Sequence, residues 1–140
     1  EYSLKEYKTY RNVNGNGNVS ANWDRFASKH KEKFDYHKSK TLHQAVTYYL
    51  TYPPDKQIEE NGHLGWKKNT RNPGESDFTW VLRSVRYARN NLFHGGKFPY
   101  DQLRDTTLLY YGLVILYEAL DLNKIIKRTF MDSPDTIEII

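Results

Sequence analysis

The chain has 140 residues, a formal net charge of +4 and a sequence pI of about 9.1. This length is sufficient for one domain with a real core, and an aromatic content of 15% is too high for a disordered chain. The absence of cysteine excludes disulfides and a cysteine-based zinc site. The longest apolar run, residues 113–116, is far too short to span a bilayer, and no signal peptide is visible. We therefore expect a cytoplasmic protein whose mild basicity permits a polyanionic partner without requiring one.

The first 21 residues are predicted to form an N-terminal arm with one short ordered piece. The arm contains Asn14-Gly15-Asn16-Gly17-Asn18, and both residue types tolerate a positive φ, so this stretch is a loop. It is not a phosphate-binding glycine loop, because no apolar strand precedes it and no Gly-Lys-Ser/Thr follows. Residues 22–130 are predicted to be a helical domain, and residues 131–140 a C-terminal tail.

A first helix is predicted from Asn22 to Phe34. Apolar side chains recur at helical spacing, and Asn22 is a plausible N-cap. The opposite face is rich in Lys and Arg, which is more typical of a solvated face than of a phosphate-contacting stripe. His30 falls on the apolar side, and we expect it to be a hydrogen-bonded core histidine rather than a metal ligand.

A second helix is predicted from Thr41 to Thr51, ending before two prolines. Asn61-Gly62 then lies between two short mixed segments, which is a strong local signal for a two-stranded hairpin. Trp66, on the second strand, is predicted to cover the core.

The third helix is predicted from Asp77 to Phe93, with Ser76 or Asp77 as its cap, and the fourth from Asp101 to Leu120. A further short helix is expected within residues 121–130. The fourth helix is apolar around much of its circumference, which suggests burial on several sides, partly by another subunit. The predicted fold class is all-α: an up-and-down four-helix bundle with a small β-hairpin insertion, assembled as a homodimer.

The end of the third helix carries unusual polar residues. Arg89 is predicted to lie toward the apolar side of the helix, where a guanidinium is costly unless it is paired. Asn90 and Asn91 are poor helix formers. His94 follows at the expected helix C-terminus, before two glycines that readily end a helix. Local patterns that oppose folding often mark a functional site.

Arg89, Asn90 and His94 together resemble the signature of the HEPN domain family, in which Arg is followed by a polar residue and, after four to six residues, by His. The spacing here, Arg89-x4-His94, is the shortest of that range. The continuation Asn-Leu-Phe-His-Gly-Gly is similar to HEPN proteins of prokaryotic defence and toxin systems. The resemblance extends mainly over residues 77–121, and it would make residues 22–130 a HEPN-like domain.

The resemblance implies a metal-independent endoribonuclease, without a cofactor, that acts as a toxin or effector in a prokaryotic defence or toxin–antitoxin system. An antitoxin or effector protein is then an expected partner beside RNA. One subunit supplies only one such histidine, so the resemblance further implies a homodimer that cuts RNA between its subunits. In this interpretation Arg89, Asn90 and His94 are catalytic. The side chains expected to hold the RNA are Arg83, Arg86, Tyr87, Asn91 and Lys97.

Two alternatives remain at the sequence level. HEPN domains also occur as non-catalytic dimerisation, nucleotide-binding or partner-binding modules. Each residue also has a purely structural interpretation: Arg89 in a buried ion pair with Asp101, Asp105 or Glu118, and His94 as a helix-end cap. A sequence-specific DNA-binding protein is disfavoured, because no helix-turn-helix with a basic recognition helix is visible.

Overall fold

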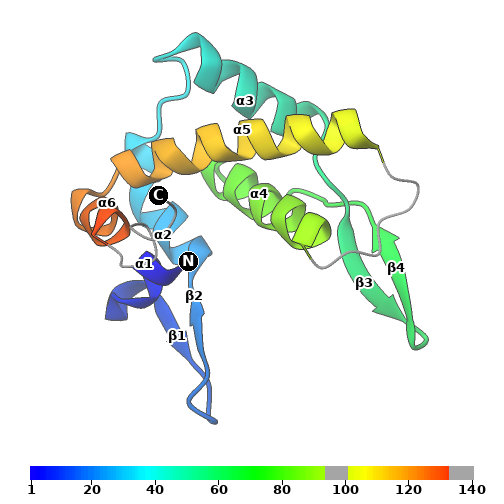
Figure 1. Ribbon diagram of the computed structural model, residues 1–140, viewed down its shortest axis with the longest axis horizontal. Helices are drawn as coiled ribbons and strands as arrows, with labels where there is room; N and C mark the ends of the chain where they lie inside the picture. Colours follow the sequence, from blue (N-terminus) through cyan, green and yellow to red (C-terminus); the bar gives the residue numbers. More distant parts are fainter. Residues whose placement is uncertain (94–100, 133–140) are drawn as a thin grey trace.

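The computed structural model describes residues 1–93 and 101–132, which form a mostly helical fold with two small antiparallel hairpins (Figure 1). In chain order the elements are α1 (Tyr2–Lys5), the 3-10 turn η1 (Lys8–Tyr10), β1 (Arg11–Val13), β2 (Val19–Ala21), α2 (Trp23–His30), the 3-10 turn η2 (Lys31–Lys33), α3 (Lys40–Thr51), β3 (Lys56–Glu60), β4 (His63–Lys67), α4 (Asp77–Phe93), α5 (Gln102–Asp121) and α6 (Lys124–Met131). Across these two described ranges, no helix combines the length and the apolar character needed to cross a bilayer.

Helices α4 and α5 lie at the centre of the fold. α4 packs against α2, α3 and α5, and α5 crosses both α3 and α4 (Figure 1). The largest side chains that are almost completely buried include Tyr49, Phe78, Leu82 and Ile115. Tyr49 donates a 2.7 Å hydrogen bond to the carbonyl oxygen of Leu108. Its hydroxyl group also lies where a Cβ atom on Gly112 would come within 3.0 Å, so the glycine permits the close approach of α3 to α5.

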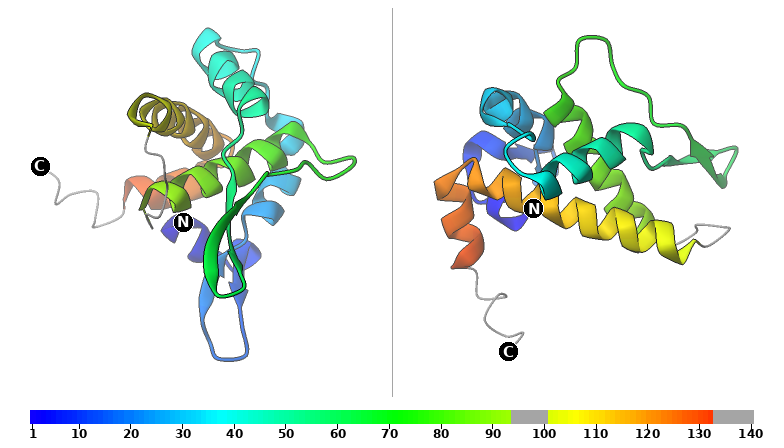
Figure 2. Two further views of the ribbon diagram at one scale, coloured as in Figure 1. Left: turned by 90° about the vertical axis from the view of Figure 1, so that its right-hand side faces the viewer. Right: turned by 90° about the horizontal axis from the view of Figure 1, so that it is seen from above.

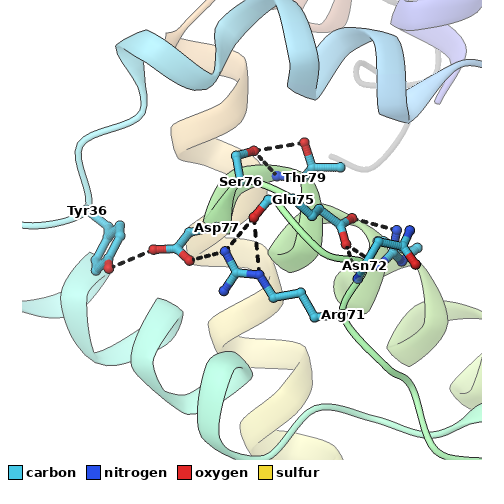
Figure 3. Close-up of polar contacts among 8 residues, drawn as sticks. Tyr36, Arg71, Asn72, Glu75, Ser76, Asp77 and Thr79 are labelled. Carbon is cyan, nitrogen blue, oxygen red and sulfur yellow. Dashed lines mark hydrogen bonds and ion pairs between the residues drawn. The ribbon is translucent and has the colours of Figure 1, made fainter.

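Helices α2 to α6 begin at side chains that accept a hydrogen bond from a free backbone N–H group. Asn22 accepts from Arg25 at 2.9 Å, and Asp101 accepts from Arg104 at 3.0 Å, so both predicted caps are confirmed. Of the two candidates for α4, it is Ser76 whose hydroxyl group accepts the N–H three residues later, at 3.2 Å (Figure 3). The predicted bounds of α4 are also confirmed.

The hairpin predicted at Asn61-Gly62 is confirmed. Both turn residues have a positive φ, +52° and +78°, as a two-residue hairpin turn requires. The register places Lys56 opposite Lys67 and Ile58 opposite Gly65. Because side chains alternate between the two faces of a hairpin, both lysines and Ile58 lie on one face.

The N-terminal 21 residues are more ordered than the predicted arm. Strands β1 and β2 pair on either side of the Asn- and Gly-rich loop, a hairpin that sequence analysis missed. Leu4 and Tyr10 belong to the buried core. The hydroxyl oxygen of Tyr7 lies 2.8 Å from that of Thr129 in α6. This segment therefore packs onto the helical body.

His30 is buried and hydrogen-bonded, as predicted. Its Nδ1 atom lies 2.7 Å from the carbonyl oxygen of Phe26, and its Nε2 atom lies 3.1 Å from the amide nitrogen of Asn123. The carbonyl can only accept, so Nδ1 carries the proton and Nε2 accepts from Asn123. The ring thereby joins α2 to the start of α6.

The two hairpins extend from the same side of the helices. In Figure 1 the hairpin β1–β2 lies near α1 and α2, and β3–β4 lies at the far end, beyond the C-terminal half of α4. The side view in Figure 2 shows both hairpins extending away from α3 and α5. The two hairpins therefore lie beside different parts of the helical body.

Candidate nucleic-acid interface

Arg89 and Asn90 form a linked pair on the last turns of α4. Asn90 Oδ1 accepts hydrogen bonds from Arg89 Nε at 3.2 Å and Nη2 at 2.9 Å. The remaining terminal nitrogen, Nη1, lies 2.8 Å from Glu1 Oε2. The guanidinium is thus oriented from two sides, by an amide and by a carboxylate.

The helical position of Arg89 suggested that its side chain would be buried among the apolar residues of α4, but it is not. It is 42% exposed. A long arginine side chain can follow an apolar surface while its charged end stays at the solvent. Of the partners considered from the sequence, Glu118 pairs instead with Lys38 at 2.6 Å. The observed partner, Glu1, was not anticipated.

Electrostatics favour a charged Glu1. Burial alone would raise the pKa of its side-chain carboxyl, but the hydrogen bond and the positive charge of Arg89 outweigh that effect and lower the pKa below its ordinary value. Near neutral pH the pair is therefore a carboxylate and a guanidinium. An anionic ligand that approached Arg89 would have to replace or share this carboxylate.

Arg86 lies one turn before Asn90 on α4. Its guanidinium is 5.9 Å from the ring centroid of Trp23 in α2, a cation–π arrangement. Trp23 and Glu1 both line an apolar cavity of about 180 Å³ between α1, α2, α5 and α6. Arg86 and Arg89 therefore each contact a residue that lines this cavity, Trp23 and Glu1 respectively.

Arg83 and Tyr87 face a different part of the structure, toward the hairpin β3–β4. Arg83 forms two contacts with the carboxylate of Glu75, at 2.6 and 2.7 Å, and both side chains are largely buried. Tyr87 lies 5.7 Å, measured to its ring centroid, from the ammonium group of Lys56. The predicted RNA-binding residues are thus divided between two sides of α4.

Asn91 has a structural role in this arrangement. It is buried, and its amide donates a 2.7 Å hydrogen bond to the carbonyl oxygen of Asp55, just before β3. The bond fixes the hairpin to α4. His94 and Lys97, the other predicted site residues, lie outside the described residues. Phe93, which ends α4, is 74% exposed.

Three lysines that were not among the predicted site residues line a cleft with Arg83 and Tyr87: Lys56, Lys67 and Lys68. The signal was present, because the turn at Asn61-Gly62 sets the register that places Lys56 opposite Lys67. Glu1 was missed for a different reason: it is 88 positions before Arg89 in the chain, and no local pattern connects them. In the described ranges, no group of three or more His, Asp or Glu side chains is arranged to hold a metal ion.

Comparison with known proteins gives no assignment: no protein-family model, curated protein or solved structure matches this chain.

Proposed function

We propose that this protein is a metal-independent endoribonuclease of HEPN type, acting as a toxin or effector in a prokaryotic defence or toxin–antitoxin system. The observation that carries the proposal is the pair formed by Arg89 and Asn90 at the end of α4, five and four residues before His94. The guanidinium is partly exposed and oriented by an amide. A permanent cation held in this way is suited to a phosphate group.

The proposed chemistry uses the ribose 2′-hydroxyl as nucleophile. One imidazole removes its proton while the oxygen attacks phosphorus, and the bond from phosphorus to the 5′-oxygen breaks. A second, protonated imidazole donates a proton to the departing oxygen. The products are a 2′,3′-cyclic phosphate and a 5′-hydroxyl. Arg89 stabilises the negative charge that develops on the phosphorus oxygens.

Two imidazoles require two subunits, because each chain supplies one His94. We propose that α2, α3, α4 and α5 form an up-and-down bundle of HEPN type that dimerises. An apolar surface on α5 supports dimerisation. The large apolar side chains of α5 that are 44–79% exposed are Leu103, Leu109, Tyr110, Leu113 and Tyr117. Leu113 and Tyr117 line the same cavity as Glu1, so this surface is continuous with the partner of Arg89.

The non-catalytic module is a second candidate, favoured by the ion pair with Glu1. In the observed arrangement the charge of Arg89 is already balanced by a carboxylate. Such a protein would dimerise and bind a nucleotide or a partner protein without cutting RNA.

The experiment that separates these candidates is RNA cleavage by the purified protein with a chelator present throughout. We expect cleavage by the wild type, products ending in 2′,3′-cyclic phosphate, and loss of activity in His94→Ala. His43→Ala removes an exposed histidine and serves as the matched control, with full activity expected. Unchanged cleavage by His94→Ala, or inhibition by the chelator, would contradict the endoribonuclease. A wild-type dimer that binds nucleotide but leaves RNA intact would favour the module.

A further inference from the structure

A basic cleft lies between the hairpin β3–β4, the loop at residues 68–76 and the side of α4 that faces them. It has a volume of about 290 Å³, at the small end of the range for ligand sites. Four of its lining side chains are cationic: Lys56, Lys67, Lys68 and Arg83. An aromatic ring, Tyr87, forms part of its wall. We refer to this site as the hairpin cleft.

Three of the four cations in the hairpin cleft have no acidic partner among the residues that the structure describes. Arg83 is neutralised by Glu75, which contacts it through both carboxylate oxygens. Within residues 1–93 and 101–132, Lys56, Lys67 and Lys68 form no ion pair. The nearest carboxylate on the same hairpin face is that of Glu60, toward the tip and next to Gly65. The cleft therefore keeps a local excess of positive charge.

The register of the hairpin β3–β4 makes this excess of positive charge unfavourable for the folded state. Lys56 and Lys67 are direct cross-strand partners, and like charges in that relationship destabilise a strand pair. The ammonium group of Lys56 also lies 5.7 Å from the centroid of the Tyr87 ring. A bound anion would relieve the repulsion, so the arrangement is suited to a negatively charged ligand.

The walls of the cleft are held in place by bonds within the protein. Asn69 donates a 3.1 Å hydrogen bond to Ser84 of α4, and Asn91 fixes the start of β3. Glu75 accepts a 2.9 Å hydrogen bond from the backbone N–H of Asn72 (Figure 3). Glu75 also accepts a hydrogen bond from Arg83, so it ties the loop to the helix. A site that is already formed loses little conformational entropy on binding.

We infer that the hairpin cleft binds one nucleotide of a single-stranded RNA. The ammonium groups of Lys56, Lys67 and Lys68 contact phosphate oxygens, and a base stacks on Tyr87, the combination by which single strands are held without reading their sequence. The choice of RNA as the strand rests on the proposed function. The cleft lies on a different side of α4 from Arg89, so it would hold the strand away from the bond that is cut.

The first test is binding, by fluorescence anisotropy, of a single-stranded RNA whose 2′-hydroxyls are methylated so that it cannot be cleaved. We expect the double variant Lys67→Ala/Lys68→Ala to bind about tenfold more weakly. Its dependence on salt should also be shallower, by about 0.7 in logarithmic slope for each phosphate that the variant no longer neutralises. The matched control, Lys31→Ala/Lys33→Ala in η2, removes the same charge from exposed positions outside the cleft. Equal weakening in both double variants would overturn the inference.

The second test concerns the aromatic wall. Tyr87→Leu should weaken binding about fivefold or more, whereas Tyr87→Phe, which keeps the ring, should bind as the wild type does. Circular dichroism of both variants verifies that α4 is intact. Binding that is unchanged in a folded Tyr87→Leu variant would contradict the stacking of a base in the cleft. Tighter binding of a duplex than of the single strand would likewise contradict it.

A third measurement separates failure of the cleft from failure of the proposed function. In cleavage assays Lys67→Ala/Lys68→Ala should raise KM while kcat at saturating RNA stays near the wild-type value, and His94→Ala should lose cleavage without losing affinity. A wild-type protein that binds through the lysines but cuts no RNA would retain the cleft and reject the ribonuclease. Cleavage with unaltered KM in the lysine variant would retain the ribonuclease and reject the cleft.

Discussion

At the scale of single residues, the arrangement around Arg89 depends on a contact that no sequence pattern contains. The helical spacing of apolar residues correctly predicted that Arg89 and Asn90 lie near the C-terminal end of α4. It did not predict that the guanidinium would reach Glu1, because the two positions are brought together only by tertiary packing, in which α2 packs on α4 and α1 packs on β2 and α6.

We predict that Arg89→Lys keeps the fold but loses most of the proposed ribonuclease activity. Lysine retains the charge but not the planar fork that bonds to Asn90 and to phosphate oxygens. Cleavage under single-turnover conditions should fall by about 100-fold, while unfolding free energy changes by less than about 1 kcal/mol because the ion pair with Glu1 is partly exposed. Full activity in this variant would show that the guanidinium is not used.

A second residue-scale prediction concerns alkaline pH. Burial raises the pKa of Tyr49 well above that of an exposed tyrosine. As the pH rises through about 10, the unfolded chain therefore releases this proton before the folded chain does, and stability falls. Urea unfolding at about pH 8 and about pH 11 measures the loss. Tyr49→Phe should be less stable by about 1 kcal/mol near neutrality, through loss of the bond to Leu108.

The same variant provides the control for the pH dependence. Without an ionisable group at position 49, the decline in stability between these two pH values should be smaller than in the wild type. Tyr10 and Tyr36, whose pKa values are also raised by burial, account for part of the remaining decline. An equal decline in both proteins would mean that Tyr49 does not contribute.

At the scale of elements, local signals were reliable where they had a specific mechanism. Caps located the starts of α2 and α5, and the turn residues Asn61 and Gly62 located the hairpin β3–β4. The hairpin β1–β2 was missed because its strands have three residues each. Val13 and Val19 are both exposed, so no alternation of apolar and polar residues reveals them.

We predict that Gly62→Ala weakens the hairpin β3–β4. Gly62 has a φ of +78°, which an alanine adopts only at a cost of about 1 kcal/mol. Hydrogen exchange of the β3 and β4 amides should become faster, and RNA affinity should fall because Lys56 and Lys67 depend on this register. The matched control is Gly15→Ala, in the other hairpin: an added methyl group meets nothing within 4 Å at either glycine, but Gly15 does not have a positive φ. Equal effects of the two substitutions would contradict the prediction.

At the scale of the whole molecule, the sequence indicated a mostly α fold and an unusually apolar α5. The hairpin register indicated that Lys56 pairs with Lys67, but not that this pair lies beside α4, because Lys67 and Lys68 approach α4 only after the hairpin and its following loop have folded back. Arg83 and Arg89 were predicted to belong to one site, since both lie on one helix. In the structure, their side chains contact different neighbours.

We predict that Leu113→Glu disrupts the proposed homodimer. Leu113 is 52% exposed on α5, and a carboxylate buried there between two subunits would be unfavourable. Analytical ultracentrifugation should show a monomer that retains its helical content. Val13→Glu, at a side chain 60% exposed in the hairpin β1–β2, is the matched control and should remain dimeric. A dimer that persists in Leu113→Glu would exclude this part of α5 from the interface.

The central claim is that two subunits contribute their imidazoles to one RNA-cleaving centre, and subunit mixing tests it most directly. Wild type and His94→Ala are co-expressed in equal amounts, with distinguishable tags so that exchange can be verified, and RNA cleavage is measured per total protein. If only dimers with two intact histidines cut RNA, the mixture should retain about one quarter of the wild-type activity, the fraction expected from random pairing. Retention of about one half, in proportion to the wild-type subunits alone, would contradict the shared centre.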